Sequence, residues 1–136
     1  MAKSYTIARL DEIPSPVPRE PDSYEWKPIR QHLGIRAFGV NAGVALRAGD
    51  WVVEKHTEIQ ENAAGHEELY FVARGSARFS IDGEEFDAPA GTLVFVPDPE
   101  TSRSAKAQDP GTAVLYIGAK RGEAFEVSRW EQKYFK

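Results

Sequence analysis

The stretch 65–75, GHEELYFVARG, constrains the fold of this chain more than any other. In an extended strand alternate side chains face opposite sides, so Glu68, Tyr70 and Val72 share one face and the intervening residues share the other. Both faces are largely apolar, which is typical of a strand buried on both sides. A carboxylate at the mouth of such a strand must line a pocket or be paired, because burying it alone is costly. Glu68 is therefore the first candidate functional residue.

Size and composition indicate the general class of protein. A chain of 136 residues is expected to form one domain, and 41% hydrophobic with 28% charged residues is usual for a globular protein. The sequence has no apolar run of the ~18 residues that a membrane span needs. It also lacks a secretory signal pattern and contains no cysteine. We expect a cytoplasmic protein that does not bind membranes.

The charge pattern argues against nucleic acid as a partner. The net charge is -4, and the lysines and arginines are scattered rather than clustered. A small molecule or another protein is the expected partner.

Prolines punctuate the N-terminal region, about 1–28, which can form neither a helix nor a central strand. They stand at Pro14, Pro16, Pro18, Pro21 and Pro28. We expect an extended arm, which could lie against its own barrel or cross onto a partner subunit.

Short β-compatible runs separated by turns fill the region 29–118. Several runs between 29 and 58 are broken by glycines. Further strands are predicted at 67–74, 77–81, 84–87, 92–96, 102–107 and 112–117. The Asp82-Gly83 pair between two alternating runs is a strong hairpin signal. This even spacing predicts an all-β sandwich or barrel.

The C-terminal segment, 119–136, differs in character. Ser128 and Glu131 have the spacing of a capping box, which predicts a short helix. Trp130 and Tyr134 would share one face of it, and so short a helix must dock on the rest of the protein.

Two motifs resemble those of the cupins, the small double-stranded β-barrel family, over about residues 45–118. The spacing from Glu68 to Gly75 fits the end of the first cupin motif, and Gly91-TLVFV-Pro97 fits the start of the second. The resemblance implies an all-β fold with a single cupin-type jelly-roll barrel, to which the residues outside it add the proline-rich arm and the short C-terminal helix. It also implies a homodimer, since small cupins commonly dimerise.

The metal ligands of the cupin motifs are incomplete in this sequence. Glu54 stands where the first histidine of the first motif would be, and Ser102 where the histidine of the second would be. The remaining candidate ligands are His56 and Glu68, with Glu54 or His66. This set suits a divalent ion such as Fe, Mn, Zn or Ni.

The polar candidates also have interpretations without a metal. Glu54, His56 and Glu58 alternate along one strand and so would point to one side. His56 could instead be a neutral histidine paired with Glu54 or Glu68, or these could form a general base with a pKa near neutrality. Glu58 and His66 would then lie on a solvated rim.

Two further residues complete the candidate site. Arg103, beside the missing second-motif histidine, could clamp an anionic ligand or lie exposed on a surface strand, since the alternation allows either Ser102 or Arg103 to face inward. Tyr70 is expected in the core and could also line a pocket.

Three functional hypotheses follow. The first is a binding-type cupin whose pocket takes a small polar organic molecule and is lined by Glu54, His56, His66, Glu68, Tyr70 and Arg103. The second is a metal-dependent isomerase, dioxygenase or decarboxylase, with His56 and Glu68 as ligands and as candidate catalytic residues. The third is an interaction module that uses the outer sheet face and the arm.

Overall fold

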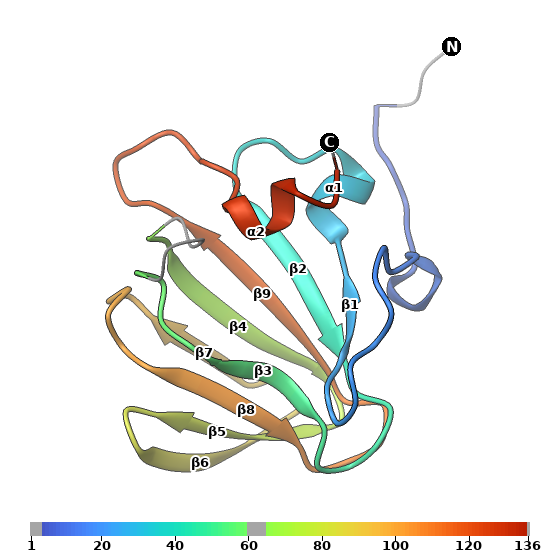
Figure 1. The fold of residues 1–136 in the computed structure, drawn as a ribbon, viewed down its shortest axis with the longest axis vertical. Coiled ribbons are helices and arrows are strands. Elements are labelled where there is room, and N and C mark those ends of the chain that lie inside the picture. Colours follow the sequence, from blue (N-terminus) through green and yellow to red (C-terminus); the bar gives the residue numbers. More distant parts are fainter. Residues whose placement is uncertain (1–3, 60–64, 136) are drawn as a thin grey trace.

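The computed structural model describes residues 4–59 and 65–135, which form two antiparallel sheets (Figure 1). One sheet has the strand order β1-β2-β9-β4-β7 and the other β3-β8-β5-β6. The strands are β1 (Glu25–Lys27), β2 (Gly39–Val44), β3 (Trp51–His56), β4 (Glu67–Arg74), β5 (Ser76–Ile81), β6 (Glu84–Pro89), β7 (Leu93–Val96), β8 (Arg103–Ala107) and β9 (Ala113–Ala119). This arrangement is a jelly-roll barrel and confirms the predicted all-β class.

The core lies between the two sheets and follows the predicted alternation. In β5 Ala77 and Phe79 are fully buried, while Arg78 between them is exposed. The turn to β6 uses Asp82 and Gly83, whose φ angles of 48° and 85° are those that a two-residue hairpin requires. The predicted hairpin is therefore confirmed.

The central strand β4 is buried on one face only. Tyr70 and Val72 face the core, at 1% and 0% exposure. Leu69 and Phe71 on the other face are half-buried. The expectation of burial on both sides was wrong for the single chain, because no described element covers the outer face of β4 completely.

The region after Pro28 begins with a helix rather than a strand. The helix α1 spans Ile29–Leu33 and ends at Gly34, which has a left-handed φ of 76°. A glycine in this conformation terminates helices readily, since it carries no Cβ. This corrects the prediction that β-compatible runs begin at Ile29.

The N-terminal arm contacts its own barrel. In its described part, before β1, it contains the 3-10 turn η1 (Leu10–Glu12), and Asp11 pairs with Arg74 of β4 at 2.9 Å. Ile13 is only 3% exposed, and its carbonyl oxygen accepts a hydrogen bond from Lys27 Nζ at 2.9 Å.

The C-terminal helix α2 (Arg129–Gln132) begins after Ser128, close to the predicted position. The capping box itself was wrong, because the Ser128 side chain makes no cap hydrogen bond. The predicted docking is confirmed, since the rings of Trp130 and Tyr134 lie 5.3 Å and 5.6 Å from that of Trp26.

Glu131 holds α2 in place. Its carboxylate lies 2.6 Å from the Arg30 guanidinium and accepts a hydrogen bond from Asn41 Nδ2 at 3.1 Å. Figure 1 shows α2 beside α1 and β2. Among the helices of the described residues, none has the length and apolar character to span a membrane.

Candidate functional site

A cavity of about 540 Å³ lies between the inner face of the five-stranded sheet, the end of β3 and the C-terminal segment. Strand register decides which residues line its wall. Glu68 is paired with Gly118, which is paired in turn with Gly39. A Cβ at Gly118 would lie 3.0 Å from Glu67 O and 3.4 Å from Glu68 Cγ, so this glycine leaves room beside the Glu68 side chain.

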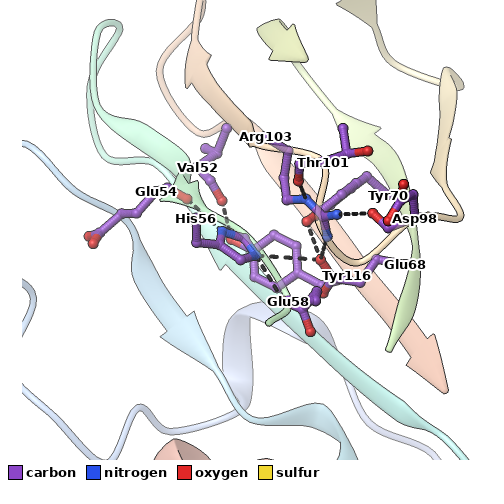
Figure 2. Close-up of polar contacts among 10 residues, drawn as sticks. All are labelled: Val52, Glu54, His56, Glu58, Glu68, Tyr70, Asp98, Thr101, Arg103 and Tyr116. Carbon is purple, nitrogen blue, oxygen red and sulfur yellow. Dashed lines mark hydrogen bonds and ion pairs between the residues drawn. The ribbon is translucent and has the colours of Figure 1, made fainter. Parts of the chain in front are cut away.

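His56, at the end of β3, forms the centre of a polar cluster (Figure 2). Its Nε2 lies 3.0 Å from Glu58 Oε2 and 3.4 Å from Glu68 Oε1. Its Nδ1 lies 2.7 Å from the carbonyl oxygen of Glu54. Ionised carboxylates and carbonyl oxygens accept hydrogen bonds but cannot donate them. Both ring nitrogens therefore donate, and the imidazole carries two protons.

The pKa values agree with this arrangement. Burial by itself lowers the pKa of His56, but hydrogen bonds to Glu58 and Glu68 outweigh it and raise the pKa to about 10. Burial tends to raise the pKa of Glu68, yet hydrogen bonds from His56 and Tyr70 and the Arg103 charge keep it below its usual value. A raised pKa argues against the hypothesis of a histidine base with a pKa near neutrality.

Arg103 faces inward and is completely buried. It begins β8, opposite His56 of β3 in the register. Its guanidinium donates to Glu68 Oε1 at 2.9 Å and to the carbonyl oxygens of Asp98 and Thr101 at 3.0 Å and 2.9 Å. Within the described structure it lies behind Glu68 rather than in the cavity wall, and so it positions Glu68.

Two tyrosines join the cluster to the core. The Tyr70 hydroxyl donates to Glu68, and the Tyr116 hydroxyl donates to the carbonyl oxygen of Val52 (Figure 2). A Cβ at Gly43 would overlap the Tyr116 hydroxyl and lie 3.0 Å from Val52 O. A glycine is therefore required at position 43 for this close approach.

Two of the predicted site residues lie in the cavity wall without joining the cluster. The Glu54 carboxylate accepts a hydrogen bond from Ser23 Oγ at 2.5 Å and points away from His56 (Figure 2). The prediction that the Glu54 side chain points to the same side as His56 assumed regular alternation, and a register shift in β3 between Val53 and His56 breaks it. His66 is 6% exposed, and its Nε2 donates to Glu126 O at 3.0 Å.

Other residues also belong to the site. Glu58, for which the sequence allowed either the side of His56 or a solvated rim, is 8% exposed and pairs with His56. Its spacing of two from His56 was the only sequence signal for it. Asn41 and Trp26 of the first two strands and Trp130 of the C-terminal segment also line the cavity. No local pattern predicts them, because the strand order brings them together.

The cluster could hold a metal ion. One ligand atom each from His56, Glu58 and Glu68 lie within 4.8 Å of one another. An imidazole nitrogen with two carboxylate oxygens is a donor set that suits a divalent ion. Glu68 Oε1, however, already accepts hydrogen bonds from Arg103 and Tyr70.

Comparisons with solved structures show the same fold. A cupin protein from Bacteroides fragilis has a TM-score of 0.62 and 22% identity, covering 93% of each chain. A predicted oxalate decarboxylase from Thermotoga maritima has a TM-score of 0.58 and 17% identity, covering 83% of this chain and 97% of that one. The plu4264 protein from Photorhabdus luminescens has a TM-score of 0.62 and 15% identity, covering 88% and 90%.

The family follows from a match of sequence. Among curated proteins there is no match. A model of the AraC-like ligand binding domain matches residues 46–134, which is more than half of the chain. The protein is therefore a member of the AraC-like ligand binding domain family, with the barrel of a cupin.

Proposed function

We propose that the protein binds a small polar organic molecule in the barrel cavity without the help of a metal. The observation that carries this proposal is the cavity itself. Its volume of about 540 Å³ lies in the range of small-molecule sites, and its wall combines aromatic rings with buried polar groups. Membership of a ligand-binding family supports the same function.

The charges of the cluster favour binding without a metal. The carboxylates of Glu58 and Glu68 are balanced by the protonated His56 and by Arg103. A metal would need the Nε2 lone pair of His56, which must first lose its proton. Because hydrogen bonds to Glu58 and Glu68 raise the pKa of His56, a metal would have to compete with this proton.

A metabolite screen by thermal stabilisation tests this function. Thr57 lines the cavity and is half-exposed, so Thr57→Trp should narrow the cavity without removing a core contact. Ile59→Trp is the matched control, because Ile59 is 59% exposed and lies outside the wall. Compounds that stabilise the wild type and Ile59→Trp, but not Thr57→Trp, support the proposal. If every stabilising compound acts equally on all three proteins, the cavity is not the binding site.

A divalent-metal enzyme is the second candidate function, favoured by the spacing of the His56, Glu58 and Glu68 ligand atoms. These residues would hold the ion, which would supply Lewis-acid or oxygen chemistry. Elemental analysis of untagged protein tests it. Near-stoichiometric metal that is lost in His56→Ala and kept in Glu54→Ala would support this function. A metal-free wild type, also after dialysis against Mn, Fe, Zn and Ni salts, would refute it.

We also propose that two copies associate through the outer face of β7, β4 and β9. Six large apolar side chains share this face in register: Leu69, Phe71, Leu93, Phe95, Leu115 and Ile117. Leu93 and Phe95 are 63% and 56% exposed. Continuous exposed apolar surface of this kind is typical of an interface.

Sedimentation analysis tests the self-association. The wild type should be a dimer and Phe95→Glu a monomer, because the new charge would be buried at the interface. Phe38→Glu is the control, since Phe38 is 42% exposed and lies outside this face. A monomeric wild type would refute the dimer and favour a different protein partner for the face.

A further inference from the structure

We propose that the molecule bound in the cavity is a small protonated amine that also carries an oxygen acceptor. This inference rests on the proposed binding function and specifies its ligand class. Three features of the wall support it: the orientation of its ion pairs, its aromatic rings and two polar groups that lack partners among the described residues.

Two buried ion pairs direct their negative ends into the cavity. Glu131 pairs with Arg30 at 2.6 Å, and Glu68 pairs with Arg103 at 2.9 Å. Both carboxylates belong to the cavity wall, whereas both guanidinium groups lie behind it. A ligand therefore meets the carboxylates first, and an ordered pair of this kind acts as a dipole that favours a cation.

The cations of the wall do not reverse this preference. His56 directs its Nε2 proton at Glu58 and Glu68, at 3.0 Å and 3.4 Å. Lys55 also borders the cavity, but it is exposed and also borders a second, outer groove. The buried part of the wall thus presents carboxylates to a bound molecule.

Aromatic rings form much of the remaining wall. They come from Tyr24, Trp26, Tyr116, Phe125 and Trp130. The Trp26 and Trp130 rings meet edge to face with their centres 5.3 Å apart. The faces of such rings attract organic cations. Carboxylates combined with ring faces are a suitable environment for an ammonium group.

Asn41 distinguishes a protonated amine from a quaternary ammonium. It is 7% exposed, and its Nδ2 donates to Glu131 Oε1 at 3.1 Å. This contact determines the amide orientation, because the opposite one would place Oδ1 against a carboxylate. Among the described residues Oδ1 is left without a partner. A buried acceptor of this kind needs a hydrogen-bond donor, which a protonated amine has and a quaternary ammonium lacks.

Trp26 indicates the second group of the ligand. Its indole Nε1 is also buried without a partner within the described part of the chain. Trp26 is paired with Gly43 of β2, and Gly43 is two residues from Asn41, so Trp26 and Asn41 lie on the same face of the sheet. An oxygen atom near the ammonium group would accept its hydrogen bond, as in an amino alcohol.

Calorimetry at pH 7 tests the ligand class with three probes of similar shape: benzylamine, benzyl alcohol and benzoate. We expect benzylamine to bind at least tenfold more tightly than benzyl alcohol, and benzoate to bind most weakly. A further tightening with 2-amino-1-phenylethanol would support the role of Trp26. Equal or tighter binding of the alcohol or of benzoate would overturn the proposal.

Two variants show whether the preference arises in the cavity. Glu58→Gln keeps the shape of a wall residue and removes its charge, so the preference for the amine over the alcohol should fall about threefold or more. Glu123→Gln, at a carboxylate 61% exposed and outside the wall, should leave it unchanged. If both variants keep the full preference, the amine binds elsewhere and the proposal fails.

The proposed function and this inference fail in different ways. If Thr57→Trp abolishes the stabilisation by some library compounds but none of these is cationic, the cavity binds ligands and only the amine class is refuted. If no compound or probe shows that sensitivity, both are refuted.

Discussion

The protonation of His56 is the most direct test of how the site is built. A pKa of about 10, against 6.5 for an unperturbed histidine, corresponds to about 5 kcal/mol of extra stabilisation of the protonated ring. This stabilisation comes from the carboxylates of Glu58 and Glu68, which more than offset burial. Glu58→Gln removes one of these charges, so we expect the pKa of His56 to fall by about 1 to 2 pH units.

Titration of the imidazole nitrogens by NMR measures this directly, because the chain contains only His32, His56 and His66. Glu54→Gln is the matched control. Its carboxylate bonds to Ser23, and only its backbone oxygen contacts His56, so the pKa should stay as in the wild type. If His56 of the wild type titrates near 6.5, or if Glu54→Gln has the larger effect, the proposed geometry of the cluster is wrong.

The same pKa values predict how stability changes with pH. The pKa of His56 is higher in the folded than in the unfolded chain, so its contribution is complete below pH 6.5 and is lost as the pH rises towards 10. The pKa of Glu68 is lowered from 4.5, so its contribution is present above that pH and is lost as the pH falls below it. The stabilisation from the cluster is greatest between pH 4.5 and 6.5.

Urea unfolding at pH 5.5 and pH 9 measures this change. The wild type should lose stability between these two pH values, whereas His56→Ala should lose much less. An equal loss in both proteins would assign the pH dependence to other groups.

Two further predictions concern the buried ion pairs. Arg103→Met should lower the free energy of unfolding by about 3–5 kcal/mol, because it leaves the Glu68 carboxylate buried without its partner. Adding Glu68→Gln should recover part of this loss. Urea denaturation of the single and double variants measures both effects, and no recovery in the double variant would refute the pairing. Glu131→Ala should weaken the docking of α2 and increase hydrogen exchange in 129–132, because it removes the contacts to Arg30 and Asn41. Ser128→Ala should change the free energy of unfolding by less than about 0.5 kcal/mol, because Ser128 makes no cap hydrogen bond. An equal effect of the two substitutions would contradict the observed anchoring.

Much of the barrel could be predicted from local patterns. Alternation places Ala77 and Phe79 inside, and Asp82-Gly83 specifies a hairpin, because side-chain period and turn geometry depend on neighbouring residues. The motif ending at Gly75 indicated the cupin barrel. Local patterns failed at 29–33, where a short helix replaces a β-compatible run.

The composition of the site depends on contacts between distant segments. The sequence placed His56 and Glu68 together through the motif, and the structure brings them within 3.4 Å. The direction of Glu54 could not be predicted, because register shifts in β3 depend on its pairing with β8. Whether Ser102 or Arg103 faces inward likewise depended on that pairing.

The sequence alone predicted an all-β fold and the residue types available for chemistry, because these follow from local periodicity, and its resemblance to the cupin motifs implied the barrel. Only the tertiary structure showed that Arg103 lies behind Glu68 and that His56 is held between two carboxylates. It also brought Asn41 of β2 to Glu131 of the C-terminal helix. The charge balance and the pKa values depend on which groups are in contact, and strand order and packing determine those contacts.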